Sequence, residues 1–171
     1  ENNLIKKLKP KFNIRLMDDK SYPYITISTS NRWPRIRKFR GKQNKQDIFF
    51  GPFANVNIVD QVLQQLERAF LLRSCSDSYF SSRKRPCVLY QIKRCSAPCT
   101  EEINSKSYKS LVQQAINFLK GKNEDIKKNL VEEMKEESKK ENYEVAATLR
   151  DRVKAISKIS FEKYSDLNND E

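Results

Sequence analysis

The sequence contains no histidine, and only three glycines and six prolines occur among its 171 residues. Any metal site or catalytic base must therefore use groups other than imidazole. So few glycines and prolines leave little material for tight turns, which favours long helices over a meander of short strands. No apolar run approaches the length of a membrane span, and no secretory signal is present. We expect a helix-rich cytoplasmic protein with no membrane partner.

Apolar residues are also scarce, at 37%, while charged residues reach 33%. This composition allows only a modest core, with much of the chain in polar helices. The length fits one medium domain or two small ones. The chain starts at Glu1 rather than at methionine, inside a helical pattern, so we expect the sequence to be a fragment of a longer protein.

The net charge of +12 is distributed unevenly along the chain. Residues 1–99 hold 20 Lys and Arg against 7 Asp and Glu, whereas residues 100–171 hold 14 against 15. The first part therefore has the charge of a segment that meets a polyanion, and the second part does not. Nucleic acid is the more common partner of such a basic segment, although an acidic protein has the same charge.

The hydrophobic pattern predicts an α+β fold that is mostly α. It comprises a small β-ribbon or sheet, then helices, a cysteine-rich irregular module and a C-terminal antiparallel helical hairpin. The expected strands are 12–16 and 22–29, with a β-hairpin over 35–50 that turns at "GKQN". The expected helices are 1–9, 55–73, a short one at 88–93, 105–122, and two within 123–159 that break at 140–142, where Asn142 is a plausible N-cap. The expected units are 21–122, 123–160 and a disordered tail at 161–171.

All four cysteines lie in one short segment, at Cys75, Cys87, Cys95 and Cys99, with gaps of eleven, seven and three residues. They could be unrelated thiols or form two disulfides, but disulfides need an oxidising compartment that nothing in the sequence indicates. Core cysteines usually lie on apolar stripes, whereas these lie in polar sequence punctuated by proline. A metal centre is the better interpretation, because its bonds would order a segment with few apolar residues.

The spacing alone leaves two metal centres open. Four thiolates suit either a tetrahedral zinc ion or an iron–sulfur cluster. The Cys-x-x-Cys pair of many zinc sites is missing, and Pro86 and Pro98 directly precede cysteines, which slightly favours a cluster. Six basic residues nearby would offset the negative charge of either centre: Arg73, Arg83, Lys84, Arg85, Lys93 and Arg94.

A basic run follows the first strand, and Trp33 and Phe39 are interleaved with it. It could be an ordinary solvated edge strand. However, basic residues occupy both faces of "RIRKFR", so we expect neither face to be deeply buried. A basic ribbon with aromatic side chains can follow a phosphate backbone and stack on an unpaired base. The residues predicted to contact DNA are Arg32, Trp33, Arg35, Arg37, Lys38, Arg40, Lys42 and Lys45.

The last two predicted helices each carry one apolar stripe. A pair this short buries little surface and should be marginal alone, so it must pack on the rest of this chain or on another chain. The nearly neutral charge of this region favours a protein partner over DNA. The predicted contact residues are Ile126, Leu130, Met134, Ala146, Leu149, Val153 and Ile156.

Several segments together resemble the UvrC family, the incision nucleases of bacterial nucleotide excision repair. They occur in the family's order over about residues 1–160: "ENNLIKKLKPKFN", "DDKSYPYI", "FFGPFAN", "FLLRSC" followed by "RPCVLYQIKRCSAPC", and "YEVAATLRDRV". The resemblance implies that Cys75, Cys87, Cys95 and Cys99 hold a 4Fe–4S cluster. It also implies a role in binding damaged DNA and positioning its incision.

The resemblance gives a role to two residues that are otherwise unremarkable. Residues 1–20 match the end of a GIY-YIG nuclease domain, in which the residue matching Glu1 binds a divalent metal ion and that matching Asn13 helps to shape the site. A carboxylate can hold the Mg²⁺ that polarises a phosphodiester. Because the GIY and YIG strands would precede Glu1, we expect this chain alone to be inactive as a nuclease.

Residues 123–160 resemble the UVR motif, which implies binding to a similar hairpin of the UvrB helicase subunit. An alternative from another class stays open, namely a zinc-stabilised nucleic-acid-binding adaptor without nuclease activity. Iron in the purified protein would favour the first interpretation, and stoichiometric zinc would favour the second.

Overall fold

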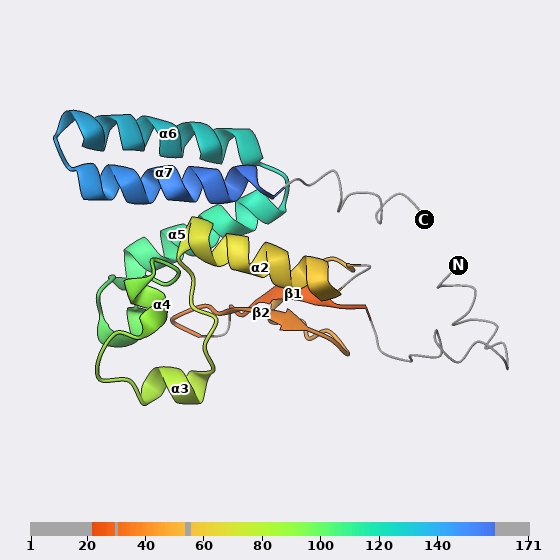
Figure 1. The fold of residues 1–171 in the computed structure, drawn as a ribbon. Coiled ribbons are helices and arrows are strands. Elements are labelled where there is room, and N and C mark those ends of the chain that lie inside the picture. The colour runs from red at the N-terminus through yellow and green to blue at the C-terminus, as the bar shows by residue number, and fades with distance from the viewer. Residues whose placement is uncertain (1–21, 30, 54–55, 160–171) are drawn as a thin grey trace, which may run out of the picture.

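The computed structural model describes residues 22–29, 31–53 and 56–159. Within them a small sheet is followed by helices, which confirms the predicted α+β class (Figure 1). The elements are β1 (Tyr24–Ile27), β2 (Ile36–Phe39), β3 (Ile48–Phe50), α2 (Val56–Phe70), α3 (Asp77–Ser81), α4 (Val88–Gln91), η2 (Pro98–Thr100), α5 (Ser105–Leu119), α6 (Asn123–Lys139) and α7 (Tyr143–Ser157). The helix expected at 1–9, the strand at 12–16, Glu1, Asn13 and the tail lie outside the described residues.

The three strands form an antiparallel sheet in the order β2–β1–β3. The prediction that residues 35–50 form a β-hairpin is wrong, because β2 and β3 each pair with β1 and not with one another. Ile27 lies opposite Ile36 on one side and Ile48 on the other. Ile25, Thr26 and Ile27 are all completely buried, so β1 is buried on both faces and occupies the centre.

The expectation that neither face of β2 is deeply buried is also wrong. Ile36 is completely buried beside Ile27, on the face that α2 covers. Lys38 shares that face and reaches its edge, where its ammonium group lies 2.7 Å from Asp60 of α2. A long basic side chain can keep its charge at the surface while its stem covers apolar neighbours, so a basic strand can still have a buried side.

Helix α2 lies across the sheet and buries one face, on which Val59, Val62, Leu66 and Phe70 lie. It ends before Leu71, whose φ of 54° is left-handed. Helix α5 begins after Asn104, whose side chain accepts a hydrogen bond from the Ser107 backbone N–H at 2.7 Å.

Helices α6 and α7 form the predicted antiparallel hairpin, and the break at 140–142 is confirmed. Asn142 precedes α7, but its side chain donates to Glu137 at 2.7 Å and does not cap the helix. The hairpin lies along α2, with α7 against it (Figure 1). Leu149 and Ile25 belong to one continuous hydrophobic core, so the hairpin packs on the rest of this chain.

The cysteine-rich region lies beside the sheet and consists of short helices joined by irregular segments. Helix α4 confirms the short helix expected near residue 88. No helix in the described ranges combines the length and the apolar character needed to cross a bilayer.

Candidate functional site

The structure brings the four cysteines to one cavity of about 440 Å³. Cys75 precedes α3, Cys87 directly precedes α4, Cys95 follows α4, and Cys99 lies in η2. All four side chains line this cavity. Residues spread over 25 positions of an irregular segment thus converge in space.

Three residues with left-handed backbone conformations determine the path of the cysteine segment. Lys93, Ala97 and Glu101 have φ values of 54°, 48° and 60°, all in the left-handed region. This conformation costs a non-glycine residue roughly 1–2 kcal/mol. It persists where surrounding contacts over-determine the backbone, and such positions cluster at functional sites. Here the turns flank Cys95 and Cys99.

The thiols of Cys95 and Cys99 lie in surroundings that oppose ionisation. Cys95 is 7% exposed, and burial raises the pKa of its thiol to about 12, with further increases from Cys75, Cys87 and Cys99. Burial and the neighbouring Cys75 also raise the pKa of Cys99. These two thiols are therefore protonated at neutral pH in the metal-free chain. A metal that binds them must displace protons, because thiolates are the ligands.

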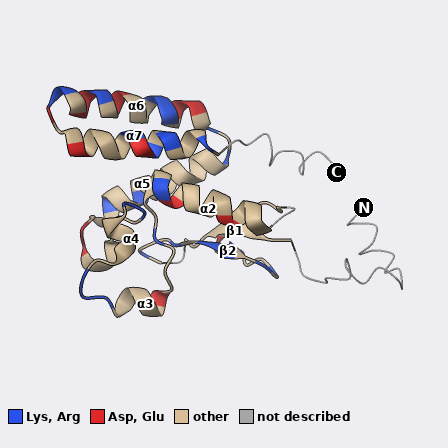
Figure 2. Cartoon of the chain, in the orientation of Figure 1, with Lys and Arg blue, Asp and Glu red and all other residues tan. Residues whose placement is uncertain are grey.

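The cavity also has a cationic wall, formed by Arg73, Arg83 and Arg85. The loop between α3 and α4 that carries two of them is blue in Figure 2. The guanidinium of Arg83 lies 3.8 Å from the ring centroid of Tyr79, and its buried Nε has no hydrogen-bond partner within the described part of the chain. This unused N–H is available to a group with acceptor atoms, such as thiolate or sulfide.

The sulfur atoms surround the cavity without meeting at one point. Within the described ranges, no three or more His, Cys, Asp or Glu side chains are grouped so that they could hold one metal ion. The cavity volume is more than ten times the roughly 30 Å³ that a water molecule occupies in the liquid. The donor set is thus four sulfurs and an arginine N–H around a space of multi-atom size.

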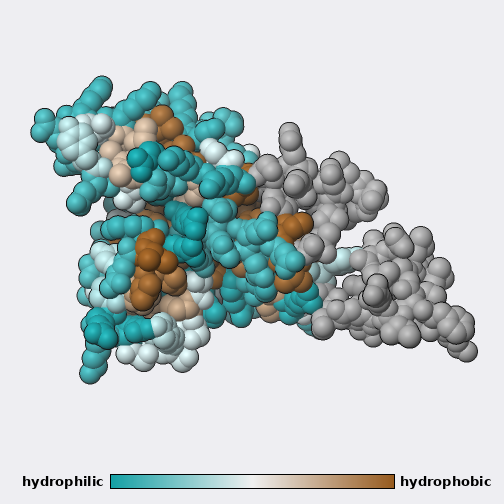
Figure 3. Space-filling model, viewed as in Figure 1, coloured by the Kyte–Doolittle hydropathy of each residue, from teal (hydrophilic) through white to brown (hydrophobic). Residues whose placement is uncertain are grey.

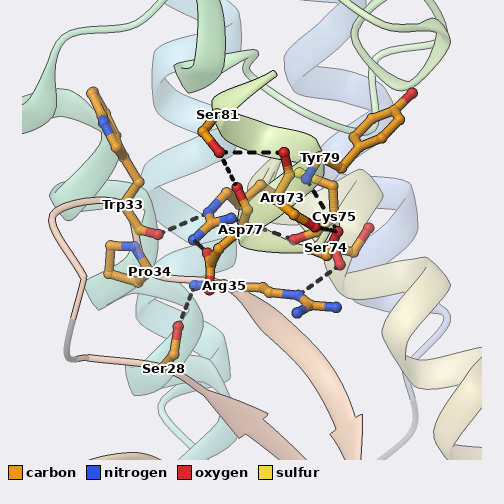
Figure 4. Close-up of polar contacts among 12 residues, drawn as sticks. Ser28, Trp33, Pro34, Arg35, Arg73, Ser74, Cys75, Asp77, Tyr79 and Ser81 are labelled. Atoms are coloured by element: carbon orange, nitrogen blue, oxygen red, sulfur yellow. Dashed lines mark hydrogen bonds and ion pairs between the residues drawn. The ribbon is translucent and has the colours of Figure 1, made fainter. Parts of the chain in front are cut away.

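Arg73 holds the start of the cysteine segment in place (Figure 4). Its side chain is 2% exposed, and its Nε donates to the Trp33 carbonyl at 2.8 Å. Its Nη1 donates to the Cys75 carbonyl at 3.3 Å, and its Nη2 forms an ion pair with Asp77 at 2.5 Å. Arg73 thus joins the segment before β2 to the segment that carries Cys75. It therefore fixes the position of Cys75 relative to the sheet.

Tyr108 of α5 also connects the segment before β2 to the segment that carries Arg73. Its hydroxyl donates to the Pro34 carbonyl at 2.7 Å and accepts from the Arg73 backbone N–H at 3.1 Å. Burial raises the pKa of Tyr108, so the hydroxyl keeps the proton that it donates. Sequence reasoning missed the structural roles of both residues, because arginine and tyrosine carry no sign of burial. The only available signal was that Arg73 lies two residues before Cys75.

At least five of the eight residues predicted to contact DNA make contacts within the chain: Arg32 and Arg37 lie over the rings of Trp33 and Phe39, and Trp33, Arg35 and Lys38 contact residues that are more distant in sequence. The Trp33 ring packs edge-on against Tyr108 at 5.3 Å between ring centroids. Arg35 Nε donates to the Ser74 carbonyl at 2.9 Å, and Lys38 is paired with Asp60. These side chains support the fold, and a base could stack on Trp33 only if its packing changed.

The free positive charge lies around the turn between β2 and β3. Arg37 approaches Asp47 at 4.0 Å. Arg40, Lys42 and Lys45 are exposed and form no ion pair with another described residue, and the same holds for Arg32 before β2. A polyanion could therefore approach this turn without breaking internal contacts.

The residues predicted to bind a partner through the hairpin are used within this chain. Ile126, Leu130, Ala146, Leu149 and Ile156 are buried, and Met134 and Val153 pack against the core. The apolar side chains exposed on the hairpin are Tyr143, at 65%, and Val145, at 48%, both in the first turn of α7. The exposed large apolar side chains of the hairpin, which a partner could contact without opening this fold, thus lie at its end.

Comparison with known proteins finds a family match for each of two parts of the chain. The family model for the UvrC/Cho excinuclease middle domain matches residues 22–118, and that for the UvrB/uvrC motif matches residues 124–159. The chain is 48% identical to the UvrABC system protein C of Paramagnetospirillum magneticum over 168 residues, which are 98% of this chain and 27% of that protein. It is 50% identical to the protein of the same name from Bartonella henselae over 159 residues, which are 93% of this chain and 24% of that protein.

The chain spans about a quarter of the length of these curated relatives. No solved structure matches it. The matched middle domain contains the sheet, α2, all four cysteines and most of α5, and the matched motif is the α6–α7 hairpin. The chain therefore belongs to the UvrC/Cho excinuclease family.

Proposed function

We propose that this chain is the central part of a UvrC-type excision endonuclease of nucleotide excision repair, acting in the cytoplasm. In this role it holds a 4Fe–4S cluster, contacts damaged DNA and binds the UvrB helicase subunit, so that the nuclease is positioned for incision. The observation that carries the proposal is the convergence of four cysteines on one cavity within the matched middle domain.

Four cysteine sulfurs lining one cavity are the donor set that a 4Fe–4S cluster requires, and the same four ligands would suit a tetrahedral zinc ion. We propose the cluster because the resemblance of the cysteine segment to the UvrC family implies it. A bound cluster supplies four iron–sulfur bonds that brace the segment. Cys75, Cys87, Cys95 and Cys99 would hold it, and Arg83 would donate to its sulfur atoms.

Anaerobic purification followed by iron, sulfide and zinc assays tests the cofactor. We expect about four iron atoms per chain and broad visible absorbance. The Cys95→Ser and Cys99→Ser variants should lose both, whereas Ser82→Ala, an exposed change in the same module, should lose neither. One zinc per chain without iron would contradict the cluster and favour the zinc-stabilised adaptor.

The nuclease chemistry belongs to the longer protein. Glu1 and Asn13 would contribute to its Mg²⁺ site, Glu1 as the carboxylate ligand. We expect the 171-residue chain to leave supercoiled plasmid intact in the presence of Mg²⁺. Nicking by the purified chain that Glu1→Ala abolishes would contradict this assignment.

A further inference from the structure

A second cavity, of about 520 Å³, lies between α2, α7 and the segment after α4. Six of its eleven lining residues are basic: Arg68, Lys93, Arg94, Arg152, Lys154 and Lys158. Asp151 is its one acidic lining residue, and its carboxylate already lies 3.1 Å from Arg150. We call this cavity the basic groove. Such an excess of positive charge around one concave surface attracts anions.

The basic groove and the cysteine cavity share a wall. Gln91 and Cys95 line the cysteine cavity, whereas Ile92, Lys93 and Arg94 between them line the basic groove. Lys93, whose backbone is left-handed, lies in the middle of this shared run of residues. Sequence reasoning assigned Lys93 and Arg94 to the charge balance of the cysteines, but the structure places their side chains in the other cavity.

Arg152 provides a second and independent observation. It is 8% exposed, and its guanidinium donates to two neutral acceptors, the carbonyl of Ala69 in the last turn of α2 and the side chain of Gln114. It forms no ion pair within 4 Å with a described carboxylate, although Glu133 of α6 lies near enough to act on it electrostatically. A buried cation whose acceptors are all neutral is stabilised further when an anion enters the adjoining groove.

The groove also contains an unused acceptor. Gln65 lines it, and the buried Oε1 of Gln65 has no hydrogen-bond partner in the part of the chain that the structure describes. A simple anion offers acceptors only and cannot satisfy this atom. A nucleotide offers phosphate oxygens for the cations together with N–H or O–H donors of its base or sugar.

We propose that the basic groove binds the sugar–phosphate backbone of nucleic acid, at a site separate from the β2–β3 turn. The inference rests on the proposed function in that the chain acts on DNA. Basic residues lie on both sides of α4 along the chain, in the α3–α4 loop (Figure 2) and at Lys93 and Arg94, and a hydrophilic band crosses the surface between the hairpin and the elements below it (Figure 3). An extended track of this kind suits a polymer of phosphates better than one acidic peptide.

The test uses the anaerobically purified 171-residue chain and a fluorescent 30-base-pair duplex, with binding followed by anisotropy at several salt concentrations. The groove variant combines Arg68→Gln and Lys154→Gln, at exposed helical positions that tolerate glutamine, with Lys158→Gln at the exposed C-cap of α7. We expect its affinity to fall at least about tenfold. The slope of log K against log salt should decrease by about 2.7, since each phosphate contact contributes roughly 0.9.

The matched control combines Lys106→Gln, Lys109→Gln and Lys128→Gln, which remove the same charge from exposed positions on α5 and α6. Equal losses in the two variants would reduce the effect to net charge and overturn the proposal. So would a groove variant that binds DNA normally but loses affinity for poly-L-glutamate, because the occupant would then be an acidic peptide. Circular dichroism of both variants excludes unfolding as the cause.

The outcome also separates this inference from the proposed function. If substitutions in the β2–β3 turn weaken binding while the groove variant does not, the groove proposal fails and the DNA-binding role stands. If the unsubstituted chain has no affinity for DNA at low salt, the DNA-binding role fails as well.

Discussion

At the scale of single residues, buried arginine side chains connect parts of the chain that are distant in sequence. Arg73 links the carbonyl of Trp33 to that of Cys75, and Arg152 links α7 to the end of α2. Each guanidinium has five N–H donors in a fixed plane, so one side chain can satisfy several carbonyl groups. These two arginines therefore position the walls of the two cavities.

The Arg73→Leu substitution should lower the free energy of unfolding by roughly 2–4 kcal/mol, because the Trp33 and Cys75 carbonyls lose their donors. Urea denaturation followed by circular dichroism measures this. Asp77→Asn is the control. The Asp77 carboxylate is largely exposed, and its substitution should cost less than about 1 kcal/mol. Equal costs would mean that the ion pair, and not the carbonyl contacts, carries the stabilisation.

Glu67 of α2 gives a pH-dependent prediction. Burial raises its pKa, against the opposing effects of Ser74 and Arg94. A carboxyl whose pKa is higher in the folded than in the unfolded state destabilises the fold once the pH exceeds these values. Glu67→Gln should therefore raise the melting temperature at pH 8, and the difference should shrink as the pH is lowered to 5. A difference that is independent of pH would exclude this origin.

At the scale of elements, the α6–α7 hairpin has two distinct apolar surfaces. Its long stripe, which includes Leu130 and Leu149, is buried against the rest of the chain. Its end carries the exposed Tyr143 and Val145 beside a small cavity that Met134 and Ala146 line. Stability and partner binding should thus depend on different residues of the same hairpin.

The double substitution Tyr143→Ser and Val145→Ser should lower the affinity for the C-terminal hairpin of UvrB at least about tenfold, because two exposed apolar contacts are lost. Isothermal titration calorimetry measures this. The double variant should keep its melting temperature, whereas Leu149→Ala should cost about 2–5 kcal/mol of stability. Unchanged binding by the double variant would place the UvrB contact elsewhere.

The β2–β3 turn is the second element with a separable role. Substitution of Arg40, Lys42 and Lys45 by glutamine should reduce the slope of log K against log salt by about 2.7 for duplex DNA. Arg35→Gln, which removes the hydrogen bond to the Ser74 carbonyl, should lower stability and leave the slope unchanged. A slope that is unchanged in the turn variant would make the turn ordinary surface.

At the scale of the whole molecule, one hydrophobic core joins the sheet to the helical hairpin, and one segment lies between the two cavities. The core runs from Ile25 in the sheet to Ile159 after the hairpin. Residues 91–95 form a wall of both the cysteine cavity and the basic groove. The two cavities are thus lined in part by one run of five consecutive residues.

If the proposed cluster is bound, its removal by chelation should weaken DNA binding by the unsubstituted chain, because Cys95 would then no longer anchor the wall that carries Lys93 and Arg94. The groove variant, which has already lost three groove cations, should respond less. Anisotropy titrations of both chains, with and without metal, measure this coupling. Identical losses in the two chains would show that the metal acts elsewhere.

The sequence by itself determined most of the helices and singled out the four cysteines that line one cavity. The apolar spacing in α2, α5, α6 and α7, the break at 140–142 and the four cysteines were all readable, because periodicity and residue chemistry are local properties. Local details differed: α2 ends at Phe70 rather than at residue 73, the short helix α3 was not predicted, and Glu137 competes for the side chain of Asn142.

Only the tertiary structure decided the strand order, the burial of Ile36 and the structural use of Trp33 and Arg35. It also decided that Arg73 and Arg152 are buried and that neighbouring basic residues separate into two cavities. These features depend on which surfaces meet across long stretches of chain. A charged side chain has the same local pattern whether its head group remains in water or bonds to a distant carbonyl, so burial becomes visible only when the packed neighbours are known.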